Sequence, residues 1–362
     1  MLFLLSVILL YTNMYTNMYT NDLNNNMYNA KNWINIVYNL ENRDTIKNIS
    51  YINNIKKLHF SIARFPGGEI SDNYNWKKNS MYIEYKHTVL KPIDFDTFMY
   101  WKQQLWIKDV IIVVNLEQWF IEWNIEKYAD LAASWVRYAN KIKHYNIKYW
   151  EIWNESYLKW TKYSISADDY VKAIKLYSIK MKREDPSIKI WVWGPTSINW
   201  YGFIDKLNSK DIFYLSNLNK IKRRYYLKSH KFNLINRKWK EWWNVLKKVD
   251  KYFDFLSLHT YIKDRKELKK DLINISKLKK LYFKKDIFIT EYSYSKHCKL
   301  NKKEKSKLLK AIITSYLNNK NIKIINYWPL RYNNSERELI NNDFNYSRNW
   351  SILRNIIKQL DF

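Results

Sequence analysis

The chain has 362 residues, of which 47% are hydrophobic and 18% aromatic, so it can bury a sizeable core and is not a wholly disordered protein. Its 63 Lys and Arg against 34 Asp and Glu give a formal net charge of +29, which raises nucleic acid or an anionic surface as a partner. A single cysteine, Cys298, excludes an intrachain disulfide and a cysteine-based metal site.

The positive charge is spread over almost every segment of the chain. The sequence is also rich in Asn, Ile and Tyr, so we attribute the charge mainly to a bias toward the residues that AT-rich codons supply. An acidic polysaccharide or a membrane surface is the second interpretation of the charge. Nucleic acid is the third, and the sequence holds no recognisable nucleic-acid module to support it.

The first ten residues, MLFLLSVILL, have the length and apolar character of a signal-peptide core, without a basic start or a clear cleavage site. This run is too short for a stable membrane span. The tandem YTNMYTNMYTND that follows is low in complexity. We interpret residues 1–28 as a signal-like segment and spacer of a secreted or cell-surface protein, with a structural strand as the alternative. Residues 29–362 then form a single domain, with an insertion around 197–238.

From about residue 33 onward, strand-like apolar runs alternate with segments of helical periodicity, which is the pattern of βα units in a parallel sheet. In chain order we expect strands at residues 33–40, 60–64, 110–114, 149–153, 188–193, 253–259, 287–290 and 322–328. The continuous VIIVV run of the third strand is typical of burial on both faces. Pro66-Gly67-Gly68 and Gly194-Pro195 mark sharp turns after the second and fifth strands.

A helix is expected after each of these strands. Periodicity alone sets the bounds of five helices, at residues 45–58, 94–106, 238–249, 267–281 and 349–360. Asn124 caps a sixth, whose apolar stripe is Tyr128, Ala132, Trp135, Ala139 and Ile142. A capping box of Ser166 and Asp169 opens the seventh, which stops before Pro186 and has the stripe Tyr170, Ile174, Tyr177 and Met181. Asn301 and Glu304 cap the eighth, with the stripe Leu308, Ile312 and Tyr316.

Eight strands, each followed by a helix, predict an α/β fold of the (β/α)8 TIM-barrel type. Such barrels form single domains of about 200 to 250 residues and more. A doubly wound sheet would show fewer units and usually a glycine-rich phosphate turn, whereas this chain has four glycines and no GxGxxG or Walker sequence. Phosphate-cradling chemistry is therefore disfavoured, and we expect no cofactor.

The expected carboxyl ends of the strands carry polar side chains, and these ends hold the catalytic groups of TIM barrels. In chain order the ends carry Arg64, Asn115 or Glu117, Asn154 and Glu155, His259 and Tyr261, Glu291, and Trp328. Glu155 ends the run KYWEIWNE after the fourth strand, and Glu291 follows the seventh, across the barrel mouth. Two opposed carboxyl groups can cut a glycosidic bond, because one protonates the leaving oxygen while the other attacks the anomeric carbon.

Four segments carry a resemblance to a known group of enzymes. They are Ala63-Arg64-Phe65-Pro66-Gly67-Gly68, Trp135-Val136-Arg137-Tyr138-Ala139-Asn140, Tyr149-Trp150-Glu151-Ile152-Trp153-Asn154-Glu155 and Ile289-Thr290-Glu291-Tyr292. They resemble segments of clan A glycoside hydrolases, in particular family 39 (β-xylosidases and α-L-iduronidases) and family 51 (α-L-arabinofuranosidases). WEIWNE is more similar to the first family, and RFPGG and WVRYAN to the second. The resemblance covers residues 45–330.

The resemblance implies a role for each strand-end residue. Glu155 matches the acid/base and Glu291 the nucleophile of the clan. Asn154 matches the residue that hydrogen-bonds the sugar 2-hydroxyl, and Arg64 the arginine beside the nucleophile. His259 or Tyr261 corresponds to the strand-six group that orients the nucleophile, and Trp328 to the aromatic platform under the sugar. No metal belongs to this set, and the implied partner is a carbohydrate substrate.

Elementary electrostatics supports the two carboxyl roles. Apolar neighbours such as Trp153 would raise the pKa of Glu155 by desolvation and keep it protonated. Arg64 and a Tyr or His donor would favour the charged form of Glu291. Glu151 has the same strand parity as Glu155 but lies about 13 Å deeper, so we expect it to be a buried structural partner of a Lys or Arg.

Each of these residues also has a purely structural interpretation. The two acids can be exposed strand ends, Arg64 a salt-bridge partner, and His259 and Trp328 core residues. The sequence also departs from the families: Glu69 stands where arabinofuranosidases generally carry Asn, and Ser156 where Pro is frequent. The accessory β-sandwich of both families is expected to be missing, since the chain stops after the eighth helix. The sugar, its anomer and exo or endo action therefore stay open.

Three functions remain in competition. The first is a retaining O-glycoside hydrolase that cleaves a poly- or oligosaccharide, with acidic polysaccharides included because of the charge. The second is a carbohydrate-binding barrel that has lost turnover, with the cleft filled by the segment 196–250. The third, a basic nucleic-acid binder, requires a contiguous positive face, and the scattered lysines argue against it.

Overall fold

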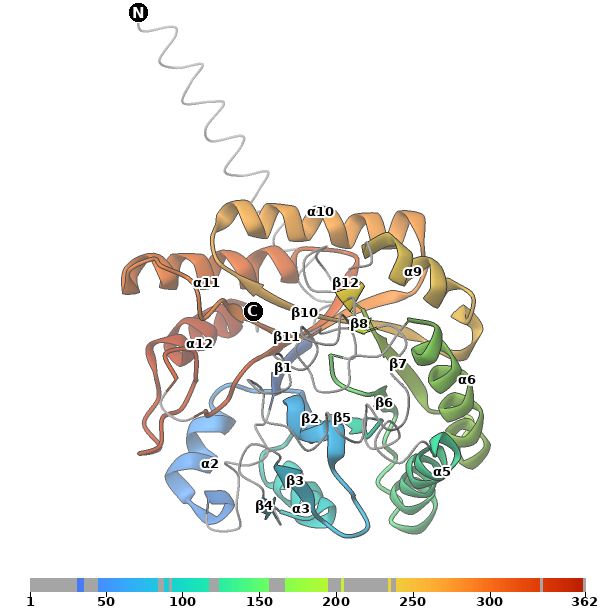
Figure 1. Ribbon diagram of the computed structural model, residues 1–362. Coiled ribbons are helices and arrows are strands. Elements are labelled where there is room, and N and C mark those ends of the chain that lie inside the picture. Colours follow the sequence, from blue (N-terminus) through green and yellow to red (C-terminus); the bar gives the residue numbers. More distant parts are fainter. Residues whose placement is uncertain are drawn as a thin grey trace, which may run out of the picture.

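A ring of strands enclosed by helices forms the body of the protein (Figure 1). The computed structural model describes residues 31–35, 45–83, 88–90, 93–116, 124–155, 167–194, 203–204, 234–235, 239–332 and 335–360. The predicted signal-like segment 1–28, the capping residue Ser166 and most of the predicted insertion 197–238 lie outside these residues. Among the described helices, none is both long and apolar enough to cross a membrane.

Eight parallel strands form the central sheet, which closes on itself in the order β1-β12-β11-β10-β7-β6-β5-β2. Their bounds are β1 Lys31–Asn35, β2 Ile62–Phe65, β5 Asp109–Val114, β6 Tyr149–Ile152, β7 Lys189–Trp193, β10 Phe255–Ile262, β11 Asp286–Tyr294 and β12 Ile322–Tyr327. Two short antiparallel pairs lie outside the ring, β3 Met81–Ile83 with β4 Thr88–Leu90 and β8 Phe203–Ile204 with β9 Leu234–Ile235. The predicted α/β class with a parallel sheet is confirmed. Absence of the accessory β-sandwich stays a prediction.

A helix follows each strand of the ring and packs on its outer face (Figure 1). The helices are α2 Ile49–Lys56, α3 Phe95–Gln104, α5 Ile125–Val136, α6 Ala167–Glu184, α9 Trp239–Lys247, α10 Arg265–Leu281, α11 Lys302–Leu317 and α12 Arg348–Leu360. Short 3-10 turns occur at η3 Thr45–Lys47, η4 Gly68–Asn73 and η8 Asp250–Tyr252, and the π-helical η6 Arg137–Ile142 continues α5.

Side-chain caps fix where several helices begin, because they satisfy backbone N–H groups that have no partner inside the helix. Asn124 accepts from the Lys127 N–H at 3.0 Å, as predicted for the start of α5. The predicted capping box of Asn301 and Glu304 is present at α11. The predicted helix 45–58 is instead two elements, because Asn48 caps α2 after the η3 turn.

The outer core lies between the sheet and the helices, and the predicted apolar stripes fill it. Tyr170, Ile174, Tyr177 and Met181 of α6 are all 0% exposed. On α5, Tyr128, Ala132 and Trp135 are buried, but the prediction for Ile142 was wrong, since this side chain is 59% exposed. The cause is η6, because a π-helix contains more residues per turn and shifts the face that later side chains occupy.

Gly194 directly follows β7, at a point where only a glycine fits. A Cβ at this position would lie 1.9 Å from the Trp243 ring of α9, which is fully buried. The same helix is held to the strand by Trp242, whose Nε1 donates to the Trp193 carbonyl at 3.1 Å. This close approach fixes the carboxyl end of β7, which borders the polar centre of the barrel.

Candidate active site

The carboxyl ends of the strands bring the predicted site residues together. Arg64 lies on β2, Asn154 and Glu155 follow β6, His259 and Tyr261 lie on β10, Glu291 lies on β11, and Trp328 follows β12. Arg64, Asn154, His259 and Glu291 are all buried, and the Glu155 side chain is 17% exposed. Two strand-end candidates remain. Asn115 is buried, and its side-chain amide donates to the Tyr74 carbonyl at 3.4 Å. Glu117 lies outside the described residues.

The backbone after β6 is unusual. Trp153 and Glu155 have φ angles of 66° and 46°, in the left-handed region that residues with a Cβ rarely adopt. Two hydrogen bonds hold the strand end in place: the Trp153 N–H donates to the Val114 carbonyl at 3.1 Å, and the Tyr170 hydroxyl to the Ile152 carbonyl at 2.7 Å. Left-handed residues of this kind cluster at functional sites, where surrounding contacts offset their cost.

An irregularity in β11 determines where Glu291 points. The pairing with β10 runs Leu258 to Ile289 and then His259 to Glu291, so β11 contains one extra residue, Thr290. The Thr290 hydroxyl hydrogen-bonds Ser257, and the Glu291 carboxylate binds Arg64, so both side chains face the barrel interior. A regular strand would turn the second of two neighbours outward. The predicted end of this strand at Thr290 was therefore too early, because β11 continues to Tyr294.

Arg64 is the centre of the charged cluster. Its Nε lies 2.6 Å from a Glu151 oxygen, its Nη1 2.8 Å from a Glu291 oxygen, and its Nη2 donates to the Asn154 Oδ1 at 2.9 Å. Burial opposes the positive charge, but the two carboxylates raise the pKa of Arg64 above its ordinary value. The predicted structural role of Glu151 as a buried partner of an Arg is confirmed, since its side chain is 0% exposed.

Glu291 is less acidic than the sequence suggested. Burial raises its pKa to about 7, while Arg64 and the Tyr261 hydroxyl, which donates to its Oε2, lower the pKa only in part. Nearby Glu151 adds a further increase. The expected effects of Arg64 and a tyrosine donor are therefore present, but desolvation outweighs them.

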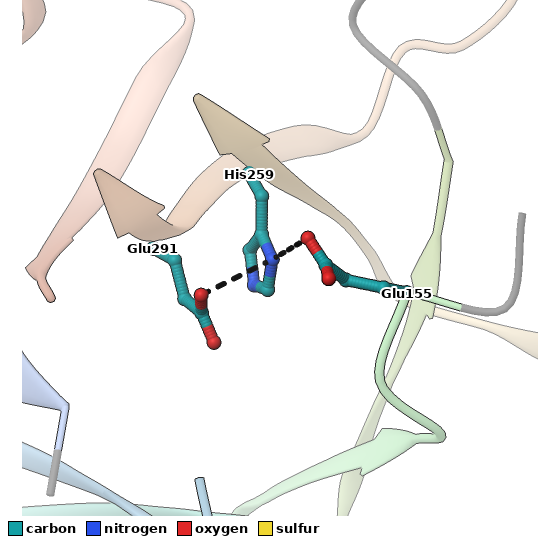
Figure 2. Close-up of side chains that lie close together, drawn as sticks. All are labelled: Glu155, His259 and Glu291. Atoms are coloured by element: carbon teal, nitrogen blue, oxygen red, sulfur yellow. Dashed lines mark hydrogen bonds and ion pairs between the residues drawn. The ribbon is translucent and has the colours of Figure 1, made fainter. Parts of the chain in front are cut away.

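His259 lies between the two candidate catalytic carboxylates (Figure 2). Its Nδ1 is 2.8 Å from a Glu155 oxygen and 3.4 Å from a Glu291 oxygen. Burial, with Arg64 nearby, holds the pKa of His259 well below its ordinary value, so the ring is neutral at neutral pH. A neutral ring can donate an Nδ1 proton to the Glu155 carboxylate or accept the proton of the Glu155 carboxylic acid.

Tyr261 and Trp328 form an aromatic corner beside Glu291. Their rings meet edge to face with centroids 6.0 Å apart, and the Arg337 guanidinium lies 4.6 Å from the centre of the Trp328 ring. Burial, followed by the charges of Glu291 and Glu155, raises the pKa of Tyr261 well above its ordinary value. The Tyr261 hydroxyl therefore stays protonated and acts as a donor.

Glu155, His259 and Glu291 also offer three possible metal ligands, with atoms that all lie within 4.8 Å of one another. A histidine with two carboxylates is a donor set that a divalent cation can use. His259 already hydrogen-bonds Glu155, and Glu291 forms an ion pair with Arg64 and accepts a hydrogen bond from Tyr261. The cluster is thus held together without an added charge. The expectation that the site needs no metal stays a prediction.

Two residues next to the cluster were not predicted. Trp193 ends β7, and its ring meets that of His259 at 3.8 Å between centroids and lies 5.4 Å from the Arg64 guanidinium. Its position at a strand end was a signal that the residue borders the site. Arg337 lies in the segment after β12, where the sequence shows no feature that points to the site.

Comparison with known proteins places the chain near sugar-cleaving enzymes. Residues 215–351 match the family described as the glycosyl hydrolase catalytic core, a range that includes His259, Tyr261, Glu291 and Trp328. A probable α-L-arabinofuranosidase C of Aspergillus fumigatus is 24% identical over 164 residues, which cover 39% of this chain and 31% of the relative. An intracellular exo-α-(1→5)-L-arabinofuranosidase of Bacillus subtilis is 26% identical over 192 residues, which cover 45% of this chain and 37% of the relative. The chain thus spans about a third of the length of the curated relatives it matches.

Solved structures show the same fold at lower identity. An α-L-arabinofuranosidase of Thermotoga maritima in complex with arabinose superposes with a TM-score of 0.59 at 18% identity, covering 85% of this chain and 63% of the other. A monomeric β-xylosidase of Caulobacter crescentus superposes with a TM-score of 0.53 at 12% identity, covering 91% and 68%. The chain therefore resembles clan A glycoside hydrolases, as its motifs predicted.

Proposed function

We propose that this chain is a retaining O-glycoside hydrolase, with Glu155 as the acid/base and Glu291 as the nucleophile. The observation that carries the proposal is the short distance between the two carboxyl groups. An oxygen of Glu155 lies within 4.8 Å of an oxygen of Glu291. Retaining enzymes hold their two carboxyl groups about 5 to 5.5 Å apart, whereas inverting enzymes separate them by about 6.5 to 9.5 Å to make room for water. The short separation favours double displacement.

The reaction takes two steps. In the first, a Glu291 oxygen forms a bond to the anomeric carbon while the bond to the leaving oxygen breaks, and Glu155 gives its proton to that oxygen. In the second, Glu155 takes a proton from water, the resulting hydroxyl attacks the anomeric carbon, and Glu291 leaves as a carboxylate. Arg64 and Tyr261 hold the attacking carboxylate, and His259 holds Glu155 through the 2.8 Å contact.

The neighbouring groups suit a sugar. The faces of Trp328 and Tyr261 provide apolar area for C–H groups. Asn154 uses its Oδ1 for Arg64, so its Nδ2 would donate to the substrate 2-hydroxyl. The matched relatives named above are arabinofuranosidases, so aryl α-L-arabinofuranosides are the first substrates to test, followed by aryl β-xylosides and glucuronides.

The decisive experiment measures hydrolysis of an aryl glycoside panel by four proteins. Glu291→Gln should lose activity by about four orders of magnitude, because it removes the attacking group. Glu155→Ala should slow substrates that need leaving-group protonation far more than activated ones. Glu126→Gln, on the exposed face of α5, is the matched control and should behave as wild type. A fluorosugar inactivator should label Glu291.

Full activity in either Glu291→Gln or Glu155→Ala, on a substrate that the wild-type protein hydrolyses, would refute the mechanism. If the wild-type protein binds oligosaccharides but hydrolyses none of them, the proposed hydrolase is refuted and the carbohydrate-binding barrel becomes the better interpretation.

We also keep two untested expectations as proposals. The net charge of +29 suggests acidic polysaccharides among the polymers to screen, and their binding should weaken as salt is added. The apolar run of residues 1–10, within the signal-like segment and spacer 1–28, suggests a secreted or cell-surface protein, which the fractionation of expressing cells tests.

A further inference from the structure

Glu151 is an acid that the proposed reaction does not use. It lies on β6, four residues before Glu155, and its side chain is 0% exposed, so substrate cannot reach it. Its Oε2 meets the Arg64 Nε at 2.6 Å, and its Oε1 accepts the Ser257 hydroxyl at 2.6 Å. Both partners donate, and Arg64 can only donate. Burial raises the pKa of Glu151 above its ordinary value, while the charge of Arg64 and the two donated hydrogen bonds oppose this increase and favour the carboxylate form.

One guanidinium therefore serves two buried carboxylates. The Arg64 Nε faces Glu151 and its Nη1 faces Glu291, so the positive charge is divided between a carboxylate below the site and the candidate nucleophile. When both carboxylates are ionised, the guanidinium neutralises only one of the two negative charges, and the three groups together carry a net charge of −1. Since all three are buried, water screens the repulsion between the carboxylates only weakly.

We propose that Glu151 is a positioning residue that shares Arg64 with Glu291, and that its negative charge sets how readily the nucleophile ionises. The inference rests on the proposed function, because it assigns a purpose to the charge of Glu291. Glu151 acts only through Arg64 and through space.

The groups that face Glu291 come from three other parts of the barrel. Arg64 faces it from β2, Glu151 and Glu155 from β6 and the residues after it, and His259 and Tyr261 from β10. Arg64 and Tyr261 lower the pKa of Glu291, and Glu151 raises it. Removing the Glu151 charge would leave Arg64 to Glu291 alone, so the pKa of Glu291 would fall.

The test compares two substitutions at position 151. Glu151→Gln keeps the shape and removes the charge, while Glu151→Asp keeps the charge and shortens the side chain. The glutamine oxygen can still accept from Arg64, and its amide can donate to the Ser257 hydroxyl, so no buried group loses its partner. The pH dependence of kcat/KM on an activated aryl glycoside should show an acid limb lower by about one pH unit in Glu151→Gln. The limb of Glu151→Asp should move less than half as far.

A direct titration separates this inference from the proposed function. The protein is labelled with ¹³C at the glutamate carboxyl, and the NMR signal absent from Glu291→Gln is followed with pH. The wild-type carboxyl should titrate near 7, and that of Glu151→Gln clearly lower. If the wild-type protein hydrolyses no glycoside but these shifts occur, the proposed function fails and the charge sharing stands.

Three results would overturn the charge sharing even in an active enzyme. The first is an unchanged acid limb in Glu151→Gln, and the second is an equal shift in both variants. The third is a Glu291 carboxyl that titrates at the ordinary value near 4.5 in the wild-type protein, a measurement that needs no variant at position 151 to fold.

Discussion

Two successive layers of side chains inside the barrel differ in chemistry although the same strands contribute them. The lower layer is apolar and consists of Ile62, Ile111, Trp191, Phe288 and Ile324, with Tyr149 and Phe255 packed against it. The upper layer lies two residues further along each strand and consists of Arg64, Val113, Glu151, Trp193, Ser257, Thr290 and Asn326, all 0% exposed. A step of two residues is about 6.6 Å along a strand.

The difference shows how the fold separates stability from chemistry. The lower layer stabilises the barrel by apolar burial and aromatic contacts, such as the stacked Phe255 and Phe288 rings at 4.3 Å. The upper layer places charges in an environment that opposes them, and each charge there depends on its partner. Substitutions in the two layers should therefore fail in different ways, and three predictions test this.

The largest effect on stability is expected from Arg64→Met, which leaves Glu151 and Glu291 buried without their cation. The free energy of unfolding, measured with denaturant at pH 8, should fall by about 3 to 5 kcal/mol. Ile62→Leu, at the lower-layer position of the same strand, is the control and should cost less than about 1.5 kcal/mol. Equal losses for the two variants would contradict the contrast between the layers.

A pH-dependent effect of intermediate size is expected from Glu291. The pKa of Glu291 is about 7 in the folded protein, against an ordinary value of 4.5. This raised pKa favours folding fully below about pH 4.5 and progressively less up to about pH 7. Between pH 5 and 8 the wild-type protein should therefore lose about 2 kcal/mol of stability relative to Glu291→Gln. Measuring both proteins cancels the contributions of other groups. A constant difference across this range would show that the pKa of Glu291 is not raised.

The smallest effect is expected from Ile324→Val in the lower layer. Removing one methylene from this packed layer should cost about 1 kcal/mol in the free energy of unfolding. Hydrolysis rates and the acid limb of the pH profile should stay at the wild-type values, because no charged group changes its partner. A shift of the acid limb in this variant would mean that the two layers are coupled through packing.

Much of the fold follows from local signals in the sequence. The VIIVV run became β5, and Asn124 and the pair Asn301 and Glu304 begin their helices, because the chemistry of a cap lies within four residues of the chain. The strand-end rule for parallel barrels also placed Arg64 and Glu291 at the same end of the barrel, where the structure joins them in an ion pair.

The remaining features depend on contacts between distant segments. Alternation along β11 would face Phe288 and Thr290 inward and Glu291 outward, and only the pairing with β10 creates the irregularity that turns Glu291 inward. The exposure of Ile142 follows from the π-helical turn η6, which Ile142 ends and which apolar periodicity does not reveal. The pKa of Glu291 likewise depends on burial outweighing Arg64, a balance that a list of neighbours does not determine.

The left-handed backbone at Glu155 bears on how a bound sugar could be captured for crystallography. A trapping variant must stop turnover without moving the backbone at position 155. Alanine at φ 46° would keep the steric cost of a Cβ, and it has no side-chain group that could hydrogen-bond the backbone in return. Asparagine is enriched several-fold in this conformation, because its short amide can bond to the nearby backbone. Glu155→Asn is therefore the better choice for soaking substrate into crystals.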